Sequence, residues 1–158
     1  MHDVINGKRR KIRVGRLVPR PLGGPVRPLP AAQRRHDMEL AQQSAKRNFP
    51  VLDAKLDRIS GKLRAARLSG QRFAYKQPLR DIYTLAYDWE QKGMLQARIG
   101  QVAALRAIAL RVNANPFNVL VRAILGVSAE RRMVSRWSAP LTKALNKGVS
   151  PKALGKHI

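Results

Sequence analysis

Arginine supplies the most conspicuous chemistry in this sequence, within the stretch Glu-Arg-Arg-Met-Val-Ser-Arg-Trp that begins at Glu130. If the stretch is helical, residues three and four apart share a face, so its polar side chains gather on one side. A guanidinium group donates paired hydrogen bonds to phosphate oxygens or to the edge of guanine, and a serine hydroxyl suits either partner. The side chains that we expect to face outward are Arg131, Arg132, Ser135 and Arg136.

Residues that perform acid–base, nucleophilic or metal chemistry are scarce by comparison. The chain has no cysteine, which excludes disulfides, cysteine-ligated zinc and a thiol nucleophile. Its three histidines lie far apart in the sequence, so none has a second ligand at metal-binding spacing. Asp81, Asp88 and Glu90 form the clearest acidic cluster, but a helix face that pairs with local arginines explains it better than a catalytic site. We expect no enzymatic activity, no metal and no cofactor.

The overall charge indicates a polyanionic partner. Lys and Arg number 32 against 9 acidic residues, which gives a formal net charge of +23 over 158 residues. Such a charge opposes compaction by self-repulsion, and a bound polyanion offsets it. A pI near 11.8 is typical of nucleic-acid-binding proteins. An anionic membrane surface is a weaker alternative, because no apolar run approaches the ~18 residues of a membrane span. Without a recognisable secretory signal, we expect a cytoplasmic protein associated with a nucleoid or a ribonucleoprotein.

Residues 1–30 are expected to form a basic, extended arm. Five prolines and the pair Gly23-Gly24 oppose helix formation, and the segment has no periodic apolar pattern. An extended basic arm suits a groove or a phosphate backbone, whereas the alternative is a solvated leader that contacts nothing. The arm cations that we expect to bind nucleic acid are Lys8, Arg9, Arg10, Lys11, Arg13 and Arg16.

Apolar periodicity predicts an all-α fold beyond the arm, a small multi-helix domain, with no strand pair and no phosphate-loop glycine pattern. A peripheral helix is expected over 31–48, and further helices over 51–68, 79–92 and 94–112. The 94–112 helix should bury Ala109 and Val112 along with its other apolar residues. The 51–68 helix carries a narrow apolar seam, which suits either a bundle core or a homodimer contact. The seam residues are Leu52, Leu56, Ile59, Leu63 and Ala66.

The connection over 71–78 brings aromatic residues and cations together. Phe73 and Tyr75 lie beside Arg72 and Lys76. Aromatic rings between cations stack on unpaired bases in some nucleic-acid-binding proteins. More often such rings anchor a loop on the core, and the sequence leaves both interpretations open.

The stretch from Asn115 onward positions the arginines that follow Glu130. Asn115 should cap a helix that begins at Pro116, because proline suits the first helical position. This helix is apolar nearly all round, with only Asn118 and Arg122 marking an exposed strip, so it must be buried. Gly126 is the expected helix end.

A second helix is expected over 129–137, with Ser128 as its cap. Its apolar side should dock on the first helix and leave the arginines outward. Pro140 limits its straight course, so a new helix is expected to begin at Ser138 or Ala139. The inward residues of the 129–137 helix are Ala129, Met133, Val134 and Trp137.

A helix, a glycine turn and a helix with a basic outer face have the layout of a helix-turn-helix unit. The strings Leu-Gly-Val-Ser and Val-Ser-Arg-Trp resemble helix-turn-helix regulators, although the spacing between Ser128 and Val134 exceeds the usual one. The resemblance implies that helix 129–137 enters the major groove of DNA. The alternative is a pair of packed core helices with a solvated basic face.

We therefore expect a helical nucleic-acid-binding domain over 51–148 and a short C-terminal tail over 149–158. The preferred function is regulatory or architectural DNA binding through the helix-turn-helix-like unit and the basic arm. A structural RNA-binding protein with a threading tail, as in a ribosome, is the first alternative. The second is an adaptor that docks an acidic protein partner and binds no nucleic acid.

Overall fold

The computed structural model describes residues 30–158, so the predictions for the arm cations lie outside the described residues. The described part is helical and contains no strand, which confirms the all-α class. Its elements are α1 (Ala31–Asn48), α2 (Pro50–Ser69), α3 (Lys76–Gln91), α4 (Leu95–Leu105), α5 (Pro116–Leu125), α6 (Arg131–Asn146) and the short 3-10 helix η1 (Leu154–Lys156).

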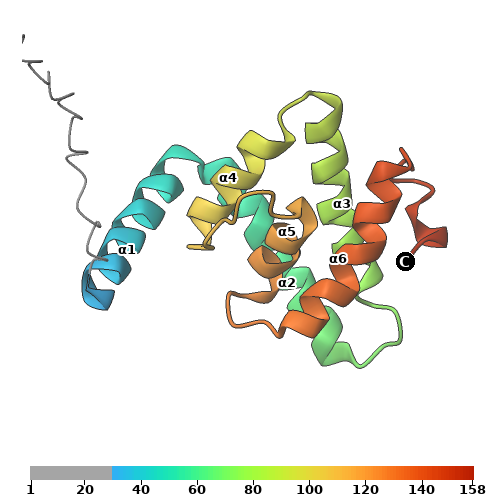
Figure 1. Cartoon of the computed structure of the whole chain (residues 1–158). Coiled ribbons are helices and arrows are strands. Elements are labelled where there is room, and N and C mark those ends of the chain that lie inside the picture. The colour runs from blue at the N-terminus through green and yellow to red at the C-terminus, as the bar shows by residue number, and fades with distance from the viewer. Residues whose placement is uncertain (1–29) are drawn as a thin grey trace, which may run out of the picture.

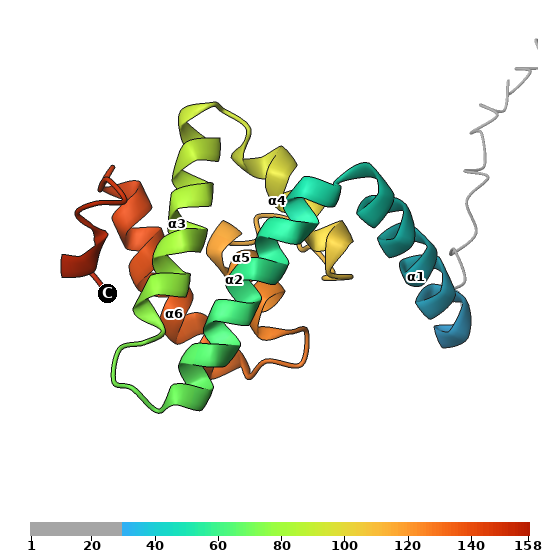
Figure 2. The same cartoon turned by 180° about the vertical axis from the view of Figure 1, so that it is seen from behind.

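Helix α5 lies at the centre of the domain. It packs against α2, α3, α4 and α6, which surround it in Figures 1 and 2. Six of its ten residues are buried, as expected for a helix that is apolar nearly all round. Asn115 caps this helix, because its side-chain oxygen accepts a hydrogen bond from the Phe117 backbone N–H at 2.9 Å.

The apolar seam of α2 belongs to the core of this chain. Leu52, Leu56, Ile59 and Leu63 are buried against the surrounding helices. These side chains are already covered within one molecule, so they are not free to form a homodimer contact.

Helix α1 is the peripheral helix that the sequence predicts. Ala45 is its only buried residue, and its N-terminal half extends from the body of the domain (Figures 1 and 2). Gln42 Nε2 donates a hydrogen bond to the Leu105 carbonyl at 2.9 Å and so fixes α1 to the end of α4. The apolar side chains of Met38 and Leu40, on the same helix, are about half exposed.

The prediction of one helix over 94–112 is wrong, because α4 ends at Leu105. Arg106 turns toward α2 and pairs with Asp53 at 2.8 Å and with Asp57 at 2.6 Å. The next residue, Ala107, has a φ of 51°, which is incompatible with a continuing helix. Residues 109–113 consequently form an exposed loop, and Val112 is 93% exposed instead of buried.

The expected break after Trp137 is also wrong, because α6 is one helix that runs through Pro140. It begins at Arg131 instead of Ala129, and its N-cap residue is Glu130 instead of Ser128. Pro140 has no N–H to donate to the Arg136 carbonyl, so it removes one helical hydrogen bond without ending the helix.

The C-terminal residues dock on α3 through hydrogen bonds to their backbone carbonyls. Lys76 Nζ donates to the carbonyl of Ile158, Arg80 Nε to that of Pro151, and the Tyr83 hydroxyl to that of Val149. Arg80 also donates a hydrogen bond from its Nη2 atom to the carbonyl of Lys152. Burial raises the pKa of the Tyr83 phenol above 10.0, and the charge on nearby Tyr87 adds to this effect.

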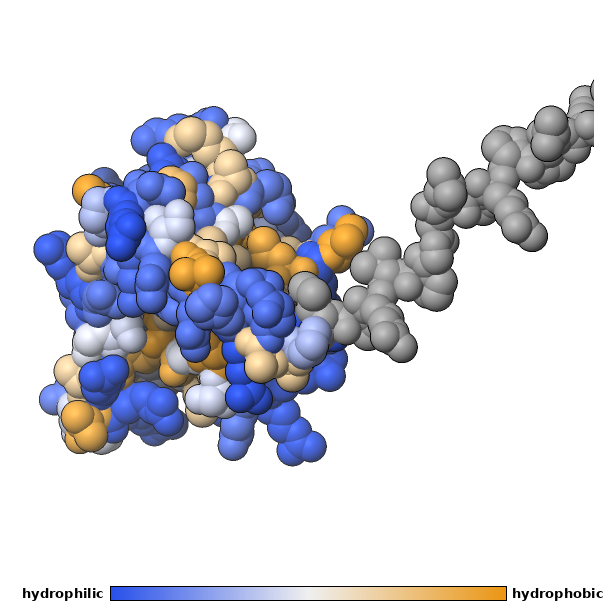
Figure 3. Space-filling model, turned by 90° about the vertical axis from the view of Figure 1, so that its left-hand side faces the viewer, coloured by the Kyte–Doolittle hydropathy of each residue, from blue (hydrophilic) through white to orange (hydrophobic). Residues whose placement is uncertain are grey.

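The face of the molecule shown in Figure 3 is mostly hydrophilic. On the face shown in Figure 3, hydrophobic side chains occur as small scattered patches among polar ones. None of the helices in residues 30–158 combines the length and hydrophobicity needed to cross a membrane.

Candidate nucleic-acid interface

The outer face of α6 carries the candidate contacts. The helix packs on α5 and α3 through its inner residues Val134, Ser138, Leu141 and Ala144. Met133 and Trp137, predicted to face inward, are only partly buried. Arg131, Arg132, Ser135 and Arg136 are all exposed. Their contact with nucleic acid stays a prediction.

Polar side chains attach the inner face of α6 to α5. The Ser138 hydroxyl donates a hydrogen bond to Asn118 Oδ1, which satisfies the one buried polar residue among the described ones. One turn later, Thr142 Oγ1 accepts a hydrogen bond from Asn115 Nδ2 at 2.8 Å. Asn115 thus caps α5 and also binds α6. These contacts fix the rotation of α6, and with it the direction of the arginines.

The N-terminal end of α6 concentrates positive charge. Arg131 and Arg132 occupy the first turn, which contains no acidic residue. The side chain of Glu130 does not cap the helix, so the first backbone N–H groups have no side-chain partner. The helix dipole is positive at this end and disfavours cations there. Besides the neighbouring Glu130, a bound anion would therefore interact favourably with this end of the helix.

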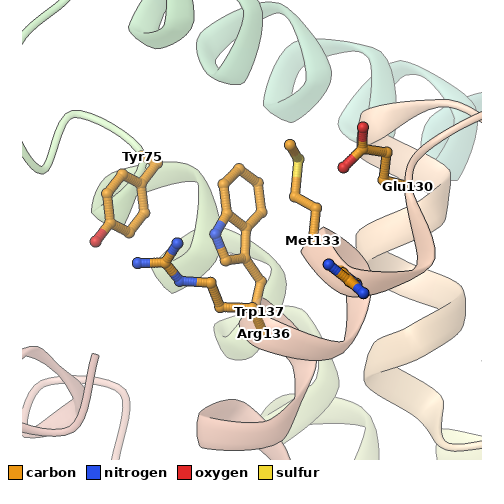
Figure 4. A pocket seen from close by; sticks show the side chains of 6 residues that line it. Tyr75, Glu130, Met133, Arg136 and Trp137 are labelled. Atoms are coloured by element: carbon orange, nitrogen blue, oxygen red, sulfur yellow. The ribbon is translucent and has the colours of Figure 1, made fainter.

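Arg132 and Arg136 line a shallow groove of about 350 Å³ on one side of α6. The aromatic rings of Tyr75 and Trp137 stack within it, with centroids 5.6 Å apart and an angle of 8° between their planes. Figure 4 shows Arg136 extending toward Tyr75, whereas Met133 lies on the other side of the Trp137 ring. The connection between α2 and α3 therefore forms one wall of this groove.

Phe73 projects from the same connection. Its side chain is 49% exposed, and the Arg72 guanidinium and the Lys76 ammonium lie 5.2 Å and 4.8 Å from its ring centroid. Its φ of 72° is rare for an aromatic residue and indicates local strain. Tyr75 packs against the core and thus anchors the loop, whereas Phe73 does not.

Arg131 and Ser135 line a second groove, of about 510 Å³, on the other side of α6. Its opposite wall is the loop between α4 and α5, which contributes Arg111, and α5 contributes Arg122. Sequence patterns did not identify Arg111, because it lay inside the expected 94–112 helix. Arg122 was recognised as exposed, since it marks the polar strip of α5, but not as part of the interface.

Acidic residues are distributed unevenly along the chain. Residues 94–158 contain eleven of the 32 basic residues but only one of the 9 acids, Glu130. The acids of α2 and α3 are partly used within the fold: Asp53 and Asp57 bind Arg106, and Asp81 binds Lys62 at 2.7 Å. Among residues 30–158, no group of three or more His, Asp or Glu side chains has the arrangement of a metal site.

Searches of protein-family models, curated proteins and solved structures found no match to this chain. Its function must therefore be inferred from the geometry and charge of the α6 face.

Proposed function

We propose that this protein binds duplex DNA through the outer face of α6, in a regulatory or architectural role. The observation that carries the proposal is the exposed N-terminal half of α6, where three arginines and uncapped backbone N–H groups meet. Phosphate oxygens accept hydrogen bonds from both kinds of donor, and arginine also reads guanine in the major groove. A positively charged helix end favours a bound anion.

The packing of α6 on α5 supports a helix-turn-helix arrangement. The polar contacts between the two helices hold α6 in one orientation, as a reading helix requires. The connection over residues 126–130 is longer than the three to four residues typical of the motif. We therefore propose a variant of the motif, with the basic arm adding affinity that does not depend on sequence.

The test compares Arg132→Ala and Arg136→Ala with the wild-type chain. A preferred site is first selected from random duplexes, and affinities for this site and for random DNA are measured by fluorescence anisotropy. We expect each variant to lose about 1–3 kcal/mol on the preferred site and much less on random DNA. Uniform losses on both duplexes would indicate phosphate contacts and an architectural role.

Lys92→Ala serves as the charge-matched control. Lys92 directly follows α3, and this end of α3 lies at the opposite end of the domain from the N-terminus of α6 (Figure 1). The Lys92 side chain is exposed and forms no ion pair within residues 30–158. The affinity of this variant should stay close to wild type. If the α6 variants bind every nucleic acid as well as this control does, the interface is wrong and an adaptor for an acidic protein becomes the better explanation.

Phe73 favours a second candidate function, the binding of structured RNA. An exposed ring on a strained loop next to cations suits stacking on an unpaired base. Phe73→Ala should then weaken binding to an RNA stem-loop by about 1–3 kcal/mol without affecting binding to duplex DNA. Equal affinity of the variant and wild type for the stem-loop would remove the reason for this alternative.

A further inference from the structure

The groove between α6 and the α4–α5 loop brings together three arginines from three separate elements. Arg111 comes from the loop, Arg122 from α5 and Arg131 from the first turn of α6. No carboxylate is among the residues that line the groove. Within residues 30–158, none of these arginines forms an ion pair. Three like charges around one groove repel each other, and a bound anion would offset this repulsion.

Neutral side chains in the groove also present hydrogen-bond donors. Asn118 lines it, and its orientation is set because Oδ1 accepts the Ser138 hydroxyl. The Asn118 Nδ2 group then has no partner among the described residues. The Ser135 hydroxyl lines the same groove. The groove therefore offers charged and neutral donors from α5 and α6, as an anion site requires.

Apolar side chains form part of the groove wall beside the polar ones. Ala109 and Val112, from the exposed α4–α5 loop, contribute to its wall. A free inorganic anion gains nothing from these apolar side chains. A sugar–phosphate backbone does, because the apolar carbons of the sugar can pack there while the phosphate meets the guanidinium groups.

We infer that this groove holds a backbone phosphate of the DNA strand beside α6. The inference rests on the proposed function and adds a second contact point to it. Arg132 and Arg136 lie on one side of α6, and the groove between α6 and the α4–α5 loop lies on the other. The α4–α5 loop thus acts as a clamp that sets the position of α6 on the duplex, and it carries no sequence preference of its own.

The first experiment measures the salt dependence of DNA binding by the full chain. The double variant Arg111→Ala/Arg122→Ala should bind the preferred site and random duplex more weakly by the same factor. The slope of log affinity against log salt should fall by about 0.9 when one phosphate is no longer bound. The control Lys55→Ala/Lys92→Ala removes two exposed charges outside the lining of this groove and should leave the slope unchanged.

A second variant, Asn118→Asp, tests the groove without removing an arginine. The aspartate retains an oxygen for the Ser138 hydroxyl but replaces the NH2 donor by negative charge among the three arginines. We expect weaker DNA binding on all sequences together with an unchanged or higher thermal midpoint, because the repulsion between arginines is relieved. Wild-type affinity for this variant would overturn the inference.

The remaining outcomes separate this inference from the function on which it rests. If Arg132→Ala and Arg136→Ala weaken binding but the groove variants do not, the clamp is wrong and the α6 interface stands. If neither set weakens binding, both proposals fail. A slope that falls equally in the lysine control would assign the effect to net charge and overturn the clamp.

Inorganic phosphate, titrated at constant ionic strength, distinguishes a DNA backbone from a free anion. A DNA clamp requires that duplex DNA perturb the Asn118 side-chain NMR signal. If inorganic phosphate saturates this signal while DNA does not perturb it, the groove binds free phosphate and the clamp is overturned.

Discussion

At the scale of single residues, the stacked rings of Tyr75 and Trp137 join the α2–α3 connection to α6. Each ring is partly exposed, so Trp137→Ala should cost less than the ~3–5 kcal/mol of a fully buried aromatic residue. The pair itself should show a coupling free energy of about 0.5–1.5 kcal/mol in a double-mutant cycle with Tyr75→Ala. Urea unfolding of the wild type, the two single variants and the double variant measures this coupling free energy. Strictly additive losses would mean that the rings do not interact in solution.

Tyr83 gives the domain a pH dependence in alkaline solution. Because burial raises the pKa of its phenol in the folded state, the unfolded chain loses this proton first as pH rises. The contribution of Tyr83 to stability is therefore complete below pH 10.0 and declines above it. Ionisation also removes the proton donated to the Val149 carbonyl. The free energy of unfolding should fall more steeply above this pH for wild type than for Tyr83→Phe. Parallel curves would contradict the assignment.

At the scale of elements, Gly126 determines how α5 is joined to α6. Its φ of 103° and ψ of 155° belong to a region that is essentially restricted to glycine. A Cβ atom there would meet no neighbour within 4 Å, so the cost of Gly126→Ala comes from backbone strain alone, about 1–3 kcal/mol. Gly61 has the same open surroundings inside α2, and Gly61→Ala should instead stabilise the chain by about 0.5–1 kcal/mol. Thermal unfolding of both variants tests the contrast.

Local sequence predicted the elements whose ends are determined locally. The cap at Asn115, the helix end at Gly126 and the seam of α2 depend on residues next to each other or on simple periodicity. The end of α4 does not depend on such local features. It depends on Gln42 binding the Leu105 carbonyl and on Arg106 reaching two aspartates some fifty residues earlier in the chain. No local pattern contains that information.

The same distinction explains how much of the candidate site could be predicted. The outward direction of Arg132 and Arg136 follows from helical phase, which the sequence contains. The continuity of α6 through Pro140 depends on its tertiary packing, and the buried Ser138 is tolerated only because Asn118 accepts its hydroxyl. Arg111 lines the groove beside α6 through a loop whose path depends on the early end of α4. Sequence patterns therefore could not predict the groove that Arg111 lines.

At the scale of the whole molecule, the domain should fold without the arm. The Pro30 carbonyl accepts a hydrogen bond from the Arg34 N–H in the first turn of α1, so a truncation that removes residues 1–29 keeps this turn intact. We expect the truncated chain to unfold at the wild-type temperature. Its salt slope on duplex DNA should be shallower by about 0.9 for each phosphate that the arm binds in the full chain. An unchanged slope would show that the arm does not contact phosphate.

The near absence of acids after residue 93 also affects how fast the protein would reach the DNA that we propose it binds. Glu130 is the only acidic side chain in residues 94–158, against eleven basic ones, so this part of the chain attracts polyanions. Attraction between this positive surface and a polyanion raises the rate of their diffusional encounter. Association would then be faster than random collision allows, and added salt would slow the arrival of the protein as well as weaken the final complex.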